Sequence, residues 1–228
     1  MANKFQNPWD VGGEYYNQNA LNTQFLPEGF LETKQSYQEW QAERDLDEPQ
    51  TASGNSGRTS TLHKRPKWRD VYAEYPKIHT TNGVVDKPAK DVFTELRGPN
   101  YEKDKLTNAC ATRVSLGLLN GGMNVPKEFL ITKGKFKGKG FIASALNLKN
   151  WLSRTSVWDT ADEVIEGPTD LSSVQAQING RNGVYIIIGG FSGGITGHAT
   201  LWVGSNNNVI GNSNYIQNGG TVYFWELL

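Results

Sequence analysis

The chain has 228 residues, with 37% hydrophobic residues and 25 glycines, an ordinary apolar content for one or two globular domains. Twenty-three basic residues balance 23 acidic ones, so the net charge of zero favours neither nucleic acid nor an anionic membrane as a partner. No apolar run reaches the ~18 residues that a bilayer-spanning helix needs. The first residues also lack the apolar core of a secretory signal, so we expect synthesis in the cytoplasm and, for any outside substrate, export without a cleaved signal.

The composition changes along the first third of the chain. Residues 1–40 hold eight aromatic residues, more than disordered tails usually carry, whereas residues 41–64 hold none and are typical of a polar linker. We therefore predict an N-terminal extension over residues 1–64 and a globular domain over residues 65–228, with the boundary near Arg65.

Helical patterns occupy the first part of this domain. Trp68, Val71, Tyr72 and Tyr75 have the spacing of an amphipathic helix, which Pro76 stops. The glycine- and lysine-rich stretch that follows, through residue 100, is predicted to be a loop. Further helices are predicted over residues 110–120, 141–154 and 171–178.

The pattern changes to strands beyond residue 180. Short apolar or alternating segments, separated by turns rich in Asn and Gly, predict strands at 183–191, 198–204, 208–216 and 221–227. Helices followed by an antiparallel sheet make the predicted fold class α+β, with N-terminal helices packed on a C-terminal antiparallel β-sheet.

Cys110 is the single cysteine, so it can form neither an internal disulfide nor a cysteine-rich metal site. It is a small buried side chain, a reactive thiol or a chance residue. Thr107 or Asn108 can cap the helix that starts here. Because a helix start favours negative charge, it stabilises a thiolate and lowers the pKa of the thiol, which favours the reactive role.

Three histidines are present, and His198 differs from His63 in the linker and His79 in a polar loop. It opens a predicted strand after the glycine-rich FSGGITG, so its imidazole can reach the end of the sheet. A histidine facing a helix-borne cysteine can take the thiol proton and later protonate a leaving amine.

A third group usually orients such an imidazole, and the next predicted strand offers Asn212 and Asn214. Both have the same parity along the strand and therefore face the same way. If Val203 pairs with Val209, His198 lies opposite Asn214, with Asn212 one step along. The choice between the two asparagines stays open.

Several strings resemble the type VI secretion amidase effectors of the fourth family, which are papain-like and related in fold to NlpC-type cell-wall peptidases. The resemblance lies in NACATRVSLGLLNGG around Cys110, GHATLW around His198, the terminal VYFWEL and the helix KWRDVYAEYP. These strings cover residues 65–228 with long gaps between them. The third residue of the family is typically Asp, and the chain has no acidic residue between Asp170 and Glu226, so Asn would substitute.

The resemblance implies a cysteine hydrolase that cuts peptidoglycan stem peptides at the γ-D-glutamyl–diaminopimelate bond, with Cys110 as nucleophile, His198 as base and no metal or cofactor. It also implies type VI delivery into the periplasm of a target bacterium and a dedicated immunity protein. Arg113 could bind a stem-peptide carboxylate, although a helix-surface ion pair is its simpler role. Trp202 could wall a peptide groove, although core packing is its simpler role.

Two other functions compete with this interpretation. One is a non-catalytic binding module of a secretion system with an incidental cysteine. The other is a cysteine peptidase or transglutaminase-like enzyme that acts on a protein substrate.

Overall fold

The computed structural model describes residues 65–104, 106–193 and 195–228, and the predicted extension over residues 1–64 lies outside them. The helical segments are α3 (Trp68–Glu74), α4 (Ala89–Arg97), η3 (Pro99–Asp104), α5 (Cys110–Asn120), α6 (Ala145–Leu152), α7 (Leu171–Ile178), η4 (Ile210–Asn212) and η5 (Ile216–Asn218). The strands are β1 (Lys77–Thr80), β2 (Gly83–Asp86), β3 (Phe129–Leu130), β4 (Gly140–Phe141), β5 (Glu163–Glu166), β6 (Gly183–Ile188), β7 (Gly197–Val203), β8 (Asn208–Val209) and β9 (Thr221–Glu226).

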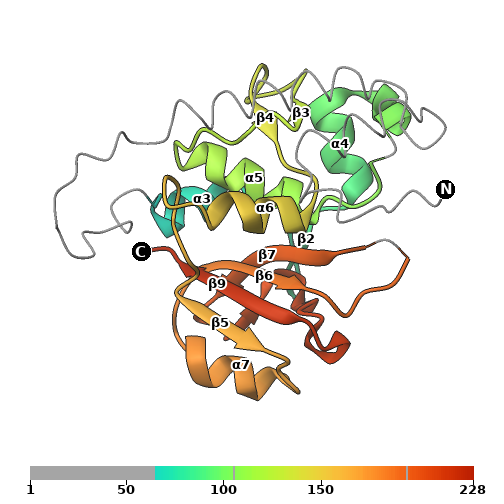
Figure 1. Cartoon of the computed structure of the whole chain (residues 1–228). Helices are drawn as coiled ribbons and strands as arrows, with labels where there is room; N and C mark the ends of the chain where they lie inside the picture. The colour runs from blue at the N-terminus through green and yellow to red at the C-terminus, as the bar shows by residue number, and fades with distance from the viewer. Residues whose placement is uncertain (1–64, 105, 194) are drawn as a thin grey trace, which may run out of the picture.

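A five-stranded sheet forms the base of the domain, with the strand order β5-β9-β6-β7-β8 and antiparallel neighbours throughout. β6 lies between β7 and β9, which agrees with its nearly continuous apolar sequence. α3, α5 and α6 lie on one side of this sheet and α7 lies on the other (Figure 1). Two small hairpins, β1–β2 and β3–β4, lie outside the main sheet.

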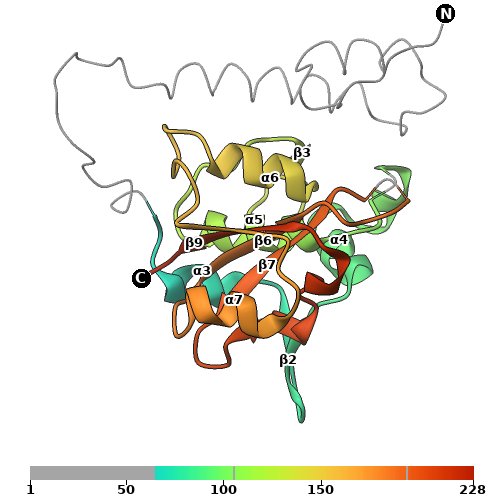
Figure 2. The same ribbon diagram turned by 60° about the horizontal axis from the view of Figure 1, so that its bottom comes forward.

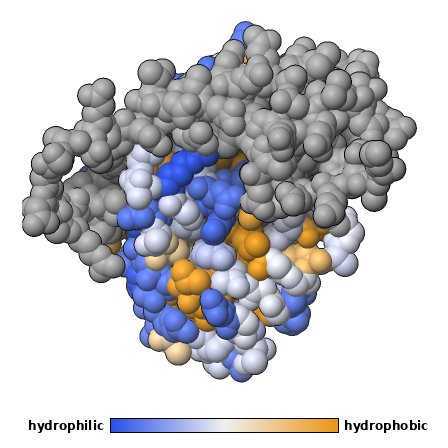
Figure 3. Space-filling model, viewed as in Figure 1, coloured by the Kyte–Doolittle hydropathy of each residue, from blue (hydrophilic) through white to orange (hydrophobic). Residues whose placement is uncertain are grey.

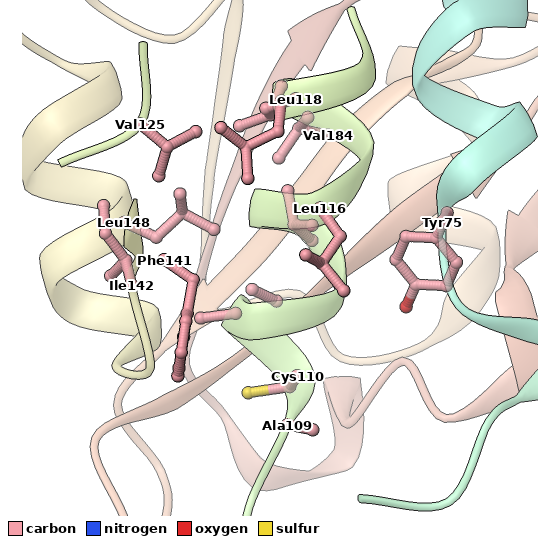
Figure 4. Close-up of a cluster of buried hydrophobic side chains, with 14 of the residues drawn as sticks. Tyr75, Ala109, Cys110, Leu116, Leu118, Val125, Phe141, Ile142, Leu148 and Val184 are labelled. Carbon is pink, nitrogen blue, oxygen red and sulfur yellow. The ribbon is translucent and has the colours of Figure 1, made fainter. Parts of the chain in front are cut away.

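Each face of the sheet buries its own hydrophobic cluster. The larger cluster joins α3, α4, α5 and α6 to one face, and the smaller one lies between the other face and α7. α5 runs through the larger cluster, and all its residues from Cys110 to Leu119 are buried (Figure 4). A helix that is buried all round needs close neighbours. α3 lies so close to α5 that position 117 has room only for glycine, since a Cβ there would lie 2.7 Å from the carbonyl oxygen of Val71.

The α+β class and most predicted elements are confirmed. α3, α5 and α7 occur where the periodicity placed them, and β6, β7 and β9 match three of the predicted strands. α6 begins at Ala145, later than predicted, because Ser144 caps it and Gly140–Phe141 form β4.

Two predictions about loops and strands are wrong. The stretch predicted as a loop through residue 100 contains the β1–β2 hairpin and α4, whose Val92, Phe93 and Leu96 join the larger core. The strand predicted over 208–216 is only β8, because the backbone turns into η4 and then adopts positive φ at Asn212.

The described surface carries few large apolar side chains. Small hydrophobic patches lie among hydrophilic residues on the face seen in Figure 3. Within residues 65–228 as described, no helix has both the length and the apolar character to cross a membrane.

Candidate active site

Cys110 is the first residue of α5, as predicted, and its side chain lies at the end of the larger core cluster (Figure 4). The N-cap of α5 is Ala109, so neither Thr107 nor Asn108 occupies the predicted N-cap position. The Asn108 side chain nevertheless accepts a hydrogen bond from the Cys110 N–H at 3.0 Å. Cys110 is only 2% exposed. Its thiol therefore lies in an apolar, largely water-free environment.

The thiol does not have the lowered pKa that its helix position predicts. Burial raises the pKa of Cys110, and this effect exceeds the opposite contributions from the backbone N–H groups of Ala199 and Ala111 and from the Arg113 cation, while Asp86 raises it further. The prediction is wrong because a charged thiolate loses more by leaving water than it gains from the helix start. The Cys110 thiol is therefore neutral at rest.

His198 is the second residue of β7, and it is 6% exposed. Burial, reinforced by the Arg113 cation, lowers the pKa of His198 to about 4, so the imidazole is neutral near pH 7 and able to accept a proton. Its ring packs against Tyr215 with 4.7 Å between the ring centroids. In the part of the chain that the structure describes, the buried Nε2 has no hydrogen-bond partner.

The structure brings Cys110 and β7 together at the residue next to His198. The backbone N–H of Ala199 approaches the Cys110 sulfur, and α5 packs against β7. This contact lies where β7 has no strand on its outer side, since β8 pairs only with Trp202 and Val203. Among the described residues, no hydrogen bond joins the Cys110 sulfur to the imidazole in this resting arrangement.

Asn212 and Asn214 do not lie where the predicted pairing places them. Val209 pairs with Trp202 and not with Val203, and residues 210–218 lie outside the sheet, in η4, η5 and the turn between them. Their side chains bind Asn208, through Asn208 Nδ2 to Asn212 Oδ1 at 3.1 Å and Asn214 Nδ2 to Asn208 Oδ1 at 3.3 Å. Neither contacts the imidazole, and the orienting role of either asparagine stays a prediction.

The two predicted substrate-binding residues are both buried. Arg113 is 7% exposed and is held by Asp86 and by the carbonyl of Lys87. Trp202 is fully buried in the smaller core and stacks on Tyr185 with 6.0 Å between centroids. Their contact with substrate stays a prediction, and their present contacts are those of an ion pair and of core packing.

A pocket of about 500 Å³ opens elsewhere, between the end of α3, α4 and the loop at residues 133–136. Neither Cys110 nor His198 lines it. Its lysines are largely paired, with Lys87 bound to Glu95 and Lys135 bound to Glu74.

A group that the sequence patterns missed lies beside Cys110. Asp86, at the end of β2, binds Tyr75 and Arg113, and Tyr75 in turn contacts Thr200 of β7. A lone Asp in a glycine- and lysine-rich stretch has no local signal for such contacts. In the described residues, no three His, Cys, Asp or Glu side chains gather in a way that could hold a metal ion.

Helices packed on an antiparallel sheet, with a cysteine at a helix start beside a strand that carries a histidine, define the class of papain-like α+β proteins of the NlpC type. The family model described as "Type VI secretion system (T6SS), amidase effector protein 4" matches residues 106–225, more than half of the chain. The chain belongs to this family. It is thus a hydrolase of the amidase type, an antibacterial type VI effector that targets peptidoglycan and is delivered into other cells.

Solved structures confirm the fold. The chain is similar to the effector Tae4 from Enterobacter cloacae, with 22% identity and a TM-score of 0.52, over 72% of this chain and 98% of that one. The Tae4–Tai4 effector–immunity complexes from Enterobacter cloacae and Salmonella Typhimurium match at 22% and 21% identity, with TM-scores of 0.53 and 0.52. Each covers 72% of this chain and 99% of the matched chain. A comparison with curated proteins found no match.

Proposed function

We propose that the chain hydrolyses an amide bond of the peptidoglycan stem peptide with Cys110 as nucleophile and His198 as general base. The observation that carries the proposal is the packing of α5, which starts at Cys110, against β7, which carries His198, with the backbone N–H of Ala199 acting on the thiol. α5 carries a thiol at its start, and β7, which packs on α5, carries an imidazole with an unpaired Nε2. A thiol and an imidazole are the two groups that thiol-based acyl transfer needs.

The protonation states support a base-assisted attack. Both groups are neutral at rest, because burial raises the pKa of Cys110 and lowers that of His198. His198 takes the thiol proton as the sulfur attacks the amide carbonyl, and the sulfur–carbon bond of the acyl-enzyme forms as the amine leaves. The imidazolium gives its proton to that amine. Neutral His198 then takes a proton from the water that attacks the acyl-enzyme. The sulfur–carbon bond breaks, the acyl group leaves as a carboxylic acid, and the imidazolium returns its proton to the sulfur, which restores the thiol.

The bond cut is the γ-D-glutamyl–diaminopimelate bond, in line with the family resemblance, and the site of action is the periplasm of the target bacterium. A delivery component of the type VI machinery carries the chain there. The matched structures titled as effector–immunity complexes support a cognate immunity protein as a partner of this chain in the producing cell.

The test is mass spectrometry of purified sacculi incubated with the full chain. Wild-type protein releases fragments cut within the stem peptide, and Cys110→Ala and His198→Ala release none while keeping the circular dichroism spectrum of the wild type. Glu163→Gln is a matched control, because Glu163 binds Arg181 at 2.7 Å on β5, away from α5. Continued release of fragments by Cys110→Ala would falsify the proposal.

The same assay separates the protein-substrate alternative. A cysteine peptidase with a protein substrate would cleave an unfolded protein such as reduced casein and leave sacculi intact. A binding module would do neither, and its Cys110→Ala variant would behave as the wild type.

A further inference from the structure

A chain of polar groups runs beside Cys110 and joins three elements. Tyr75, which follows α3, is only 1% exposed, and its hydroxyl donates to Asp86 Oδ1 at 2.8 Å. The same hydroxyl lies 3.1 Å from Thr200 Oγ1 on β7. Burying a tyrosine hydroxyl and a carboxylate is costly unless both find partners, so this arrangement requires all three side chains together.

Arg113 connects the same carboxylate to α5. Its Nη1 lies 3.4 Å from Asp86 Oδ2, and its Nε donates to the Lys87 carbonyl at 2.9 Å. Arg113 is three residues after Cys110 and therefore one helical turn along α5. The two bonds fix the end of β2 to the helix that carries the thiol.

Asp86 thus contacts, directly or through one side chain, both elements of the proposed reaction. Arg113 belongs to the helix of Cys110, and Thr200 is two residues after His198 and on the same face of β7. The rest of the β1–β2 hairpin projects away from the domain (Figure 2), so the contacts at Asp86 lie at its base.

The charges at this position also face the thiol. Arg113 lowers the pKa of Cys110 and Asp86 raises it, and they are the charged groups that act on the thiol from α5 and from β2. Burial raises the pKa of Asp86, and Arg113 and the Tyr75 hydroxyl oppose that rise. Buried ion pairs contribute little net stability in many proteins, because desolvation offsets the attraction. Stability alone is therefore a weak reason for a carboxylate here.

We propose that Asp86 is a positioning residue for the Cys110–His198 pair, holding α5 through Arg113 and β7 through Tyr75 and Thr200. The inference rests on the proposed function, since it assigns Asp86 to the geometry of that pair. Without the carboxylate, the thiol-bearing helix and the imidazole-bearing strand lose their shared anchor. A misplacement of about 1 Å between reacting groups can cost about 100-fold in rate.

The experiment compares full-length Asp86→Asn and Asp86→Ala in hydrolysis of a purified stem-peptide fragment. Asp86→Asn keeps one of the two acceptor oxygens, enough for Tyr75 or Arg113 but not for both, so kcat should fall about 10-fold. Asp86→Ala removes both links, so kcat should fall about 100-fold with KM within about 3-fold. Rescue by the isosteric Asn distinguishes positioning from a general loss of fold. A folded Asp86→Ala with wild-type kcat, or with a raised KM alone, overturns the proposal.

Alkylation by iodoacetamide gives a second readout that needs no turnover. Because Cys110 is the single cysteine, the rate against pH reports its thiolate alone. In Asp86→Asn the midpoint should shift to lower pH, since the charge that raises the thiol pKa is gone. An unchanged midpoint in Asp86→Asn together with an unchanged alkylation rate in Asp86→Ala overturns the proposal, because neither the charge around the thiol nor its placement then depends on Asp86.

If Asp86→Ala fails to fold, Tyr75→Phe carries the test. It removes only the hydroxyl that bridges Asp86 to Thr200, and kcat should fall about 10-fold; an unchanged kcat overturns the proposal. Failure of the proposed function is distinguishable, because it appears as an active Cys110→Ala. An inactive Cys110→Ala beside a fully active Asp86→Ala rejects this inference alone.

Discussion

The two faces of the sheet differ in how they hold the helices that cover them. α5, on the larger core, is buried along its length, whereas α7, on the smaller core, buries only Val174 and Ile178 and exposes its outer side. The proposed nucleophile, Cys110, therefore lies on an element that is packed from all directions. The imidazole follows the parity of Thr200 and Trp202 and packs against Tyr215, a residue of the smaller cluster.

This difference implies that the two predicted catalytic residues differ in how far they can move. A fully enclosed helix can move little without opening the core, because protein interiors are close-packed. His198 packs against Tyr215, which precedes the short 3-10 turn η5, and within the described residues no hydrogen bond holds its Nε2. In the proposed mechanism, the imidazole should therefore approach the sulfur by a movement on the side of β7 and not of α5.

The largest expected effect on the free energy of unfolding comes from Glu128, a buried carboxyl group on the side of the larger core. Glu128 accepts hydrogen bonds from Ala143 N at 3.2 Å and Asn147 Nδ2 at 2.8 Å, and burial raises its pKa to about 7. The fold thus binds a proton more tightly than the unfolded chain does. Its contribution to stability is complete below about pH 4.5 and is lost as the pH rises to about 7, a change of about 3 kcal/mol.

Glu128→Gln should remove this pH dependence. Urea unfolding at pH 4.5, 6 and 8 measures it, and the difference between the wild type and the variant isolates Glu128 from the other titrating groups. An identical slope in both proteins would show that the carboxyl titrates in the fold as it does in the unfolded chain.

His198 should make the stability of the fold change with pH in the opposite direction to Glu128. Its pKa is lowered to about 4 in the fold, so the unfolded chain binds the proton more tightly. The stabilising contribution is present above about pH 6.5 and is lost as the pH falls toward 4, by at most about 3 kcal/mol. Against His198→Gln, the wild type should lose stability over this range in urea unfolding, and a parallel loss in the variant would contradict the prediction.

A matched tryptophan pair compares the packing of the two cores. Trp225 and Trp202 are both fully buried, one in each cluster, but only Trp225 donates a hydrogen bond, to the Asp159 carbonyl at 3.2 Å. Within the described residues, the Trp202 Nε1 has no partner. Trp225→Phe should cost about 2 kcal/mol, and Trp202→Phe about 1 kcal/mol or less, because it also removes an unpaired N–H.

Thermal and urea unfolding measure both variants, and equal costs would mean that the hydrogen bond of Trp225 contributes nothing. The same Trp202→Phe protein tests the groove-wall role of Trp202. A residue that only packs the core leaves KM unchanged, and a raised KM would support contact with the substrate.

Local patterns predicted those parts of the fold whose interactions are local. The spacing of Trp68, Val71 and Tyr75 predicted α3, and the apolar and alternating runs predicted β6 and β7. α4 was not predicted, because its flanking lysines and glycines suggested a loop, although Val92, Phe93 and Leu96 have helical spacing. The strand predicted after Val209 failed because turn residues such as Gly211 and Asn212 outweighed the alternation.

The candidate site divides in the same way. The sequence by itself determined that Cys110 begins a helix and that His198 lies on a strand, because helix starts and alternating strands depend on residues that are neighbours in the sequence. Only the tertiary structure decided that the thiol is buried and neutral, and that Asp86 joins α5 to β7. Desolvation and contacts between residues 11 to 125 positions apart depend on the packed fold, and no local pattern contains them.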